Sequence, residues 1–476
     1  MHSGKLEKYI IPIIILVSIL AFTFWFVHDP VENLAANVPG MDNRPKRDTG
    51  LNEVINIGES LFNYTEHTSL LTGKWPRFRG SDVDNINKEN IPLINSWGEG
   101  PKILWNVDLG EGHAAPAIYN GKVYLLDYDE IKKADALKCF ALETGELIWK
   151  LSYKVHVKRN HGISRTIPVV TDKYVVSIGP RGHVMCAEPN SGKFLWGIDL
   201  VKEYNTEIPY WYTGQCPFIE NDLAIIAPGG SSMIIAVDCA SGDVVWETEN
   251  PDNWKMSHSS VMPMNFAGKK MYVYCAVGGI CGISAEGADR GKILWKTNKF
   301  SPSVVAPSPL ILDNGKILIT AGYGAGSGLF QLHKEGENFS VEMLQKYKPK
   351  DGLASEQQTP LFYKGHIFSI LPKDAGSLRL QLVCTNTEDC TNFVWTSGKT
   401  ERFGLGPYFI ADDKFFILDD DGTLSIAKAD ISSFTILDKA RIIEGQDAWG
   451  PLALADGFLL MRDSKQMVCI DIRRDN

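Results

Sequence analysis

Short apolar runs broken by Gly, Asn or Asp follow one another from about residue 100 to the C-terminus. In stretches such as "APAIYNGKVYLLDYD", two apolar runs flank a turn dipeptide, which is the pattern of two strands joined as a hairpin. Similar stretches return throughout this part of the chain. The pattern therefore predicts an all-β body built from short antiparallel strands.

Two markers recur along this pattern. The first is a Trp preceded by two apolar residues and, four positions before it, by Gly, as in "GELIW" and "GKFLW". The Trp series, which skips one period, is Trp105, Trp149, Trp196, Trp246, Trp295 and Trp395. The second marker is a Pro at an apolar run, in the series Pro116, Pro168, Pro217, Pro263, Pro309, Pro360, Pro407 and Pro451. Successive prolines are 44 to 52 residues apart, so they predict eight units.

Each unit contains four short apolar runs, and four strands at this period are typical of a propeller blade. The Gly of each Trp motif suits the tight turn between the third and fourth strands, and the Trp is expected to pack between neighbouring blades. The last unit stops after three strands, whereas residues 102–109 form a spare strand before the first. Pairing these two segments would close the ring. We predict an eight-bladed β-propeller over residues 76–476.

The runs "GKVYLLD" and "FALETGELIW", with the opening segment "WPRFRGSDVDNI", resemble the PQQ-like propeller repeat family. Quinoprotein alcohol dehydrogenases and the propeller lipoprotein of the outer-membrane β-barrel assembly machinery share this repeat. The resemblance covers about residues 76–476 and implies four-stranded PQQ-like blades. It leaves function open, because one fold hosts enzymes, scaffolds and sensors.

A redox enzyme is the alternative that the resemblance raises. Dehydrogenases of the family commonly carry two adjacent cysteines over the cofactor and a Ca²⁺ site. This sequence has no adjacent cysteine pair, and "DDDG" at residues 419–422 lacks the Glu of an EF-hand loop and reads as a solvated turn. We expect no cofactor and no metal site, with PQQ and calcium as the alternative. Whether the protein is an enzyme stays open, with a non-enzymatic function preferred.

The N-terminus has a different composition. Residues 9–27 carry no charge and are long enough to cross a membrane as a helix. Lys5 and Lys8 precede this run, and residues 28–43 contain no Lys or Arg, so the positive-inside rule predicts a cytoplasmic tail at 1–8, a single-pass inner-membrane anchor and a periplasmic body. A cleaved signal peptide is the alternative. Residues 28–75 are polar and turn-rich and are predicted to form a tether.

Charge and cysteine content narrow the picture further. A net charge of −9 without a basic run argues against a nucleic-acid partner. Of the nine cysteines, Cys139, Cys186 and Cys469 lie in strand-like runs and are expected to be buried. Cys384 and Cys390 are candidates for a short disulfide-closed loop in an oxidising compartment.

Polar and aromatic residues gather just before the marker prolines, where the innermost strands should begin at one mouth of the central channel. The candidate site residues are His113, His161, Arg165, Trp211, Tyr212, Gln215, His258, Gln358, Arg402 and Trp449. Ser260, Ser308 and Glu356 belong to the same segments. The Gly-rich stretch at 322–328 precedes no helix, so it is interpreted as a flexible inter-strand loop rather than a phosphate cradle.

Two interpretations of this mouth compete. Its polar residues could simply satisfy strand ends in a water-filled channel, or they could form a pocket for an anionic or aromatic ligand, with Arg as a bidentate donor and rings as stacking faces. The sequence thus predicts a scaffold or ligand-binding module of a bacterial envelope complex with envelope protein partners. The alternative is a PQQ-dependent or other redox enzyme that uses the same mouth.

Overall fold

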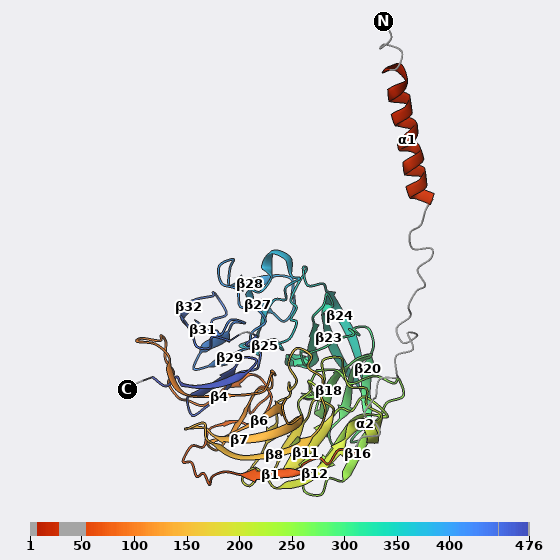
Figure 1. The fold of residues 1–476 in the computed structure, drawn as a ribbon. Coiled ribbons are helices and arrows are strands. Elements are labelled where there is room, and N and C mark those ends of the chain that lie inside the picture. Colours follow the sequence, from red (N-terminus) through yellow and green to blue (C-terminus); the bar gives the residue numbers. More distant parts are fainter. Residues whose placement is uncertain (1–6, 28–53, 446, 475–476) are drawn as a thin grey trace. The chain divides into compact units, whose positions relative to one another are not determined.

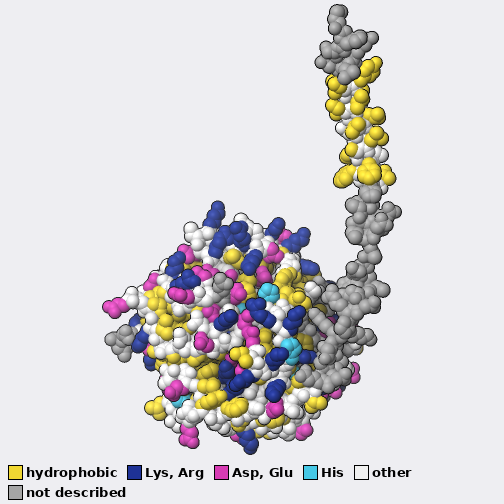
Figure 2. Space-filling model, viewed as in Figure 1, with side chains coloured by type: hydrophobic (Ala, Val, Ile, Leu, Met, Phe, Trp, Pro, Cys, Tyr) yellow, Lys and Arg dark blue, Asp and Glu magenta, His cyan; other side chains and the backbone are white. Residues whose placement is uncertain are grey.

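The computed structural model describes residues 7–27, 54–445 and 447–474, and the chain divides into two compact units, 1–53 and 54–476. In the first unit the described element is the helix α1 (Glu7–Val27). Its residues Tyr9–Val27 are long and apolar enough to cross a membrane, a property that a signal sequence shares. Figure 2 shows apolar side chains along this helix, and basic and acidic side chains mixed over the visible face of the second unit.

The second unit contains eight antiparallel sheets, as predicted (Figure 1). In sheet order, the first four blades are β5 (Ala117–Tyr119), β6 (Lys122–Asp129), β7 (Ala134–Ala141), β8 (Leu147–Lys154); β9 (Val169–Val170), β10 (Val175–Ile178), β11 (His183–Ala187), β12 (Phe194–Asp199); β13 (Phe218–Glu220), β14 (Leu223–Ile226), β15 (Ser232–Asp238), β16 (Val244–Glu249); and β17 (Met262–Phe266), β18 (Lys269–Ala276), β19 (Gly279–Ser284), β20 (Ile293–Thr297).

The other four blades follow the same order. They are β21 (Leu310–Ile311), β22 (Lys316–Ala321), β23 (Gly326–Glu335), β24 (Asn338–Tyr347); β25 (Leu361–Tyr363), β26 (His366–Ile370), β27 (Leu382–Asn386), β28 (Phe393–Thr396); β29 (Tyr408–Ala411), β30 (Lys414–Leu418), β31 (Thr423–Lys428), β32 (Ile436–Arg441); and β33 (Ala453–Ala455), β34 (Phe458–Arg462), β35 (Gln466–Asp471), β4 (Lys102–Asp108). The short helices are α2 (Leu200–Tyr204), η1 (Asp313–Gly315) and η2 (Gly376–Leu378). The first strands of neighbouring blades contact one another, as β5 does with β9 and β33, and therefore surround the centre.

The last blade is completed by a strand from the start of the propeller. β4 pairs antiparallel with β35, with Trp105 opposite Cys469 and Asp108 opposite Gln466. This is the pairing expected for residues 102–109. Because the two ends of the repeat share one sheet, opening the ring would require breaking a full strand ladder.

The Trp motif joins consecutive blades. Trp149 on β8 donates its indole N–H to the carbonyl of Pro189 at 3.0 Å, and Trp196 on β12 donates to that of Cys239 at 2.8 Å, each in the following blade. The motif Gly of that following blade faces the ring, so a Cβ on Gly192 would lie 2.6 Å from Trp149. Gly is therefore required at position 192 for two reasons: its φ is 69°, and the Trp149 ring leaves no room for a side chain.

Part of the predicted tether belongs to the propeller. β1 (Ser60–Asn63) adds to the outer edge of β8, and β2 (Lys74–Trp75) pairs with the inner strand β5. Residues 54–75 therefore correct the predicted boundary at residue 75, while residues 28–53 of the predicted tether lie outside the described residues. Neither strand has partners nearby in sequence, so local periodicity carried no signal for them.

Residues 74–87, here called the channel plug, run against the inner strands. β3 (Ile86–Asn87) pairs in parallel with β29. Arg79, 4% exposed, donates to four backbone carbonyls, which belong to Val83, Asp84, Thr359 and Pro360. The plug thus ties the N-terminal segment to blades 6 and 7, and its neighbouring residue Phe78 reaches the cavity described next.

All nine cysteines are buried free thiols. Cys139, Cys186 and Cys469 are buried in strands, as predicted. Cys384 and Cys390, the candidates for a disulfide-closed loop, are both free thiols here, and they lie in different hydrophobic clusters.

Candidate functional site

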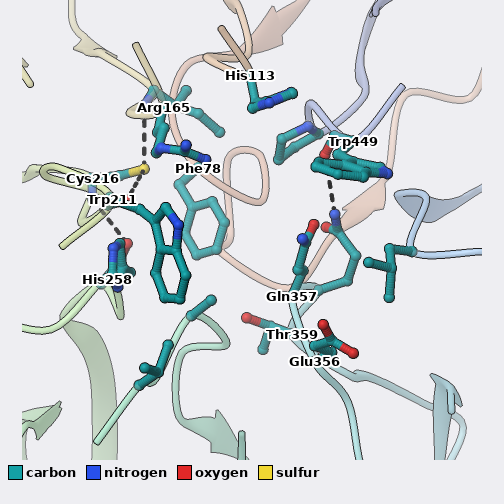
Figure 3. Close-up of a pocket in the computed structure, with 18 of the residues that line it drawn as sticks. Phe78, His113, Arg165, Trp211, Cys216, His258, Glu356, Gln357, Thr359 and Trp449 are labelled. Carbon is teal, nitrogen blue, oxygen red and sulfur yellow. Dashed lines mark hydrogen bonds between the residues drawn. The ribbon is translucent and has the colours of Figure 1, made fainter. Parts of the chain in front are cut away.

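A cavity of about 360 Å³ opens at the mouth where the inner strands begin. Its size is within the range of small-molecule sites. Figure 3 shows side chains from several blades converging around it, with Phe78 of the channel plug among them. The mouth is therefore a pocket with side chains from many loops rather than an open pore.

Seven of the ten predicted residues line this cavity. They are His113, His161, Arg165, Trp211, His258, Gln358 and Trp449. They come from six separate segments, so the residues before these marker prolines converge at one mouth. Glu356 and Ser260 of the same segments also line the cavity.

The other three predicted residues lie elsewhere. Tyr212 donates its hydroxyl to the carbonyl of Lys158. Gln215 is fully buried, and its amide pairs with the backbone N and O of Ala227 at 3.0 and 2.6 Å. Arg402 is a partly exposed side chain that donates to surface carbonyls, including those of Lys399 and Ser377. These three positions are structural corrections to the candidate list.

Several lining residues were missed. Phe78 comes from the channel plug, and Tyr323 comes from the Gly-rich loop that was interpreted as flexible. Gln357 and Lys373 also contribute. The remaining missed residues are Ile167, Gly214, Cys216, Val304, Ala306, Thr359, Leu405 and Pro451. The sequence did contain a signal for Tyr323, because a single aromatic residue in a Gly-rich loop suggests that its ring contacts another group.

A chain of hydrogen bonds links blades 2 to 6 around the mouth. The backbone N–H of Cys216 donates to Ser260 Oγ at 2.9 Å, that of Ser260 to Ser308 Oγ at 2.9 Å, and that of Ser308 to Thr359 Oγ1 at 2.8 Å. Ile167 N–H continues the chain to the Cys216 sulfur at 3.3 Å. These buried hydroxyls satisfy strand ends, so the structural interpretation of the mouth holds for them.

Arg165 is different, because its hydrogen-bonding capacity is largely unused. A single nitrogen, Nη2, donates to the carbonyls of Asn160, His161 and Gly162 at 3.1, 2.6 and 3.4 Å. Its Nε is buried without a partner, and no carboxylate in the described parts of the chain pairs with it. Burial lowers the pKa of Arg165 to about 10, so the guanidinium remains charged at neutral pH. A desolvated charge in this state favours an anion in the cavity.

Two imidazoles flank Arg165. Burial, together with the nearby Arg165 charge, lowers the pKa of His258 to about 4 and that of His113 to about 3. Both are therefore neutral at pH 7. His113 Nε2 donates to the His161 carbonyl at 3.2 Å, whereas the buried Nε2 of His258 has no partner within the described chain.

Aromatic rings form two walls of the cavity. Trp211 and Tyr323 stack with centroids 5.6 Å apart and planes inclined by 10°. On the other side, His113 and Trp449 lie 5.1 Å apart, and Asp420 accepts the Trp449 indole N–H at 2.9 Å. That hydrogen bond gives the "DDDG" turn a role beyond solvation. Flat apolar groups are suited to such walls.

The loops that carry these rings hold non-glycine residues at positive φ. The φ values are 51° at His161, 69° at Tyr212 and 55° at Tyr323. Such conformations cost on the order of 1–3 kcal/mol each and are kept where the surroundings enforce them. The mouth is thus organised in advance of any ligand.

PQQ with calcium is the cofactor pair that the fold family implies. The aromatic walls and Arg165 suit a planar anion. Among the described residues, however, no three His, Cys, Asp or Glu side chains converge as a metal site. Within the cavity lining, Glu356 is the one carboxylate, beside Lys373. The calcium part of the pair does not fit these residues, so no catalytic step is assigned.

Fold and mouth together define an eight-bladed β-propeller with a ligand-sized pocket in its channel. The family model for outer membrane protein assembly factor BamB matches residues 133–349. This match covers less than half of the chain, and it supports the likeness to the PQQ-like propeller repeat that the sequence predicted. No curated protein matches the sequence.

Solved structures with a similar fold include BamB, a methanol dehydrogenase and a designed protein. BamB from Moraxella catarrhalis aligns with a TM-score of 0.51 at 13% identity, over 78% of this chain and 99% of that one. A europium-containing methanol dehydrogenase aligns at 0.54 and 11%, over 84% and 89%. The computationally designed Ika8 protein aligns at 0.51 and 14%, over 78% and 99%. At these identities the likeness concerns the fold alone.

Proposed function

We propose that the protein is a membrane-anchored, periplasmic binding module whose channel mouth takes a small anionic ligand with a flat apolar part. The ligand's anionic group would meet the free Nε and Nη1 of Arg165, and its flat part would lie between the Trp211 and Trp449 walls. The observation that carries this proposal is the buried, unpaired Nε of Arg165.

The setting of this module follows from the N-terminal segment. The apolar run Tyr9–Val27 suits an anchor. The lysines before it and the lack of Lys and Arg at residues 28–43 favour an inner-membrane anchor with the propeller outside the cytoplasm. The match to an assembly-factor family supports envelope protein partners, with the blades as a scaffold around the pocket.

The test is ligand binding by the full chain in detergent micelles. Indole-3-acetate and benzoate serve as ring-bearing anions, with calorimetry and Trp fluorescence as readouts because Trp211 and Trp449 line the cavity. We expect saturable binding that Arg165→Met weakens at least about tenfold, the scale for losing one partner of a desolvated charge contact. Arg402→Met is the matched control, because Arg402 is partly exposed and lies outside the cavity.

Two results would count against this proposal. Equal weakening by Arg402→Met would mean that binding is non-specific surface attraction, and absence of binding by any anion would remove the ligand role. PQQ belongs in the same series, with and without calcium. If PQQ bound only in the presence of calcium, that result would support the alternative of a redox enzyme.

A further inference from the structure

The two sides of the pocket carry side chains of opposite charge. Arg165 and His258 lie on one side, and Glu356 lies across the cavity from them, as Figure 3 shows. In the described chain no ion pair joins Arg165 to Glu356 or to any other carboxylate. Opposite charges in one cavity that do not pair with each other leave room for a ligand between them.

The side around Glu356 is acidic overall. Burial raises the pKa of this carboxyl, and the charges of Asp374 and Asp420 act in the same direction, whereas Lys373 opposes them. Glu356 and Lys373 line the cavity here, and Asp374 and Asp420 lie outside the lining but close enough to act on Glu356. Counted together, these four side chains carry a net negative charge, which disfavours a second anionic group on this side and favours a cation.

Tyr323 lies between the two sides. Burial raises the pKa of its hydroxyl, with Glu356 acting in the same direction and Arg165 in the opposite one, so the hydroxyl is within electrostatic range of both. Its ring stacks on Trp211 at 5.6 Å. The apolar body of a ligand would therefore cross an aromatic surface between the two charged ends.

Resting on the proposed function, we further propose that the ligand is a small zwitterion, with a carboxylate at Arg165, an ammonium at Glu356 and an aromatic side chain on the Trp211–Tyr323 surface. A short peptide that carries an aromatic side chain has this chemistry. A polyanion does not, because its second charge would face the acidic side.

Gly322 supports the placement of Glu356. A Cβ on Gly322 would lie 2.4 Å from Glu356 Cγ, so a larger residue there would displace the carboxylate. The Gly-rich loop therefore both carries Tyr323 and leaves space for the acidic side chain. One loop sets the aromatic surface and the position of the charge.

The experiment uses the full chain in detergent at pH 7 with three ligands: the amino acid tryptophan and the peptides Gly-Trp and Gly-Gly-Trp. Each is compared with its N-acetyl form, which lacks the ammonium, and its C-terminal amide, which lacks the carboxylate. For at least one length we expect both modifications to weaken binding at least about tenfold, because each removes one desolvated charge contact. Glu356→Gln should abolish the difference between free and acetylated peptide. Glu342→Gln, at an exposed position on β24, should preserve it.

The outcomes separate this proposal from the preceding one. If the acetylated peptides bind as tightly as the free ones at every length, the zwitterion proposal is wrong while Arg165-dependent anion binding stands. The same holds if indole-3-acetate binds and no peptide does. If neither anions nor peptides bind, both proposals fail.

Discussion

The channel plug and the open mouth each hold a buried arginine, and they treat it differently. Burial lowers the pKa of Arg79 and of Arg165 to about 10, so the cost of desolvation is similar. Arg79 engages Nε and both terminal nitrogens on four carbonyls, whereas Arg165 engages Nη2 alone. The fold satisfies the first guanidinium internally and leaves the second for a group that comes from outside. Unused capacity, rather than burial, distinguishes a binding arginine from a structural one.

The largest expected effect is at the plug. Arg79→Met leaves four carbonyls without their donor, and each buried unsatisfied acceptor costs about 1–3 kcal/mol. We expect the free energy of unfolding to fall by at least about 3 kcal/mol in urea denaturation. Arg402→Met is the control, because the partly exposed Arg402 makes carbonyl contacts that are open to solvent, where water can replace them. Equal losses in the two variants would show that burial is not the cause.

A smaller effect is expected from adding one methyl group to each region. Gly80 in the plug has a φ of 80°, and a Cβ would lie 2.9 Å from the Trp75 ring, so Gly80→Ala should cost about 1–3 kcal/mol. At Gly214 a Cβ would lie 2.8 Å from both Cβ and Cδ2 of His258, so the backbone must shift slightly, but Gly214 does not have a positive φ. Gly214→Ala should therefore cost less stability than Gly80→Ala, in which the close contact and the positive φ add. Denaturation midpoints of the two variants decide this, and a larger loss at Gly214 would contradict it.

The blades could be predicted from the sequence because their information is local. Each hairpin carries its own turn residues and apolar runs, and the Trp and Gly markers report a contact that every blade repeats with the next. The N-terminal strands β1 and β2 could not be predicted, since their partners lie more than forty residues away. Their own residues show no period that would announce pairing.

Only part of the candidate site could be predicted from the sequence, and the reason is geometric. The distance from a marker proline places a residue at the mouth, but neighbouring residues in extended backbone point in opposite directions. Cys216 lines the cavity, while its neighbour Gln215 pairs with the backbone of Ala227. Trp211 and Tyr212 also diverge, but there a turn and the positive φ of Tyr212 separate the two side chains. Sequence spacing determines the level of a side chain along the channel, and only the backbone direction determines whether it faces the ligand.

The third prediction concerns pH. The folded protein keeps His258 and His113 neutral down to about pH 4 and pH 3, whereas the unfolded chain takes up protons near pH 6.5. The unfolded state therefore binds more protons below pH 6.5, and stability falls as the pH drops toward 4, by up to about 1.4 kcal/mol per pH unit for each imidazole. Urea midpoints between pH 7 and 4.5 measure this slope. His258→Gln should remove the contribution of one imidazole to the pH dependence of stability. An unchanged slope would show that His258 is not buried as described.

The smallest expected change in stability is the most informative about the mouth. Arg165→Met removes a desolvated charge that makes three hydrogen bonds through one nitrogen, so the loss of those bonds and the relief of burial oppose each other. We expect the free energy of unfolding to change by less than about 1 kcal/mol, in contrast to Arg79→Met. Urea denaturation of both variants without ligand measures the difference. If Arg165→Met lowers the free energy of unfolding as much as Arg79→Met does, Arg165 is a structural residue as well. In that case its charge stabilises the fold through the three carbonyl contacts, and does not serve to bind an external anion.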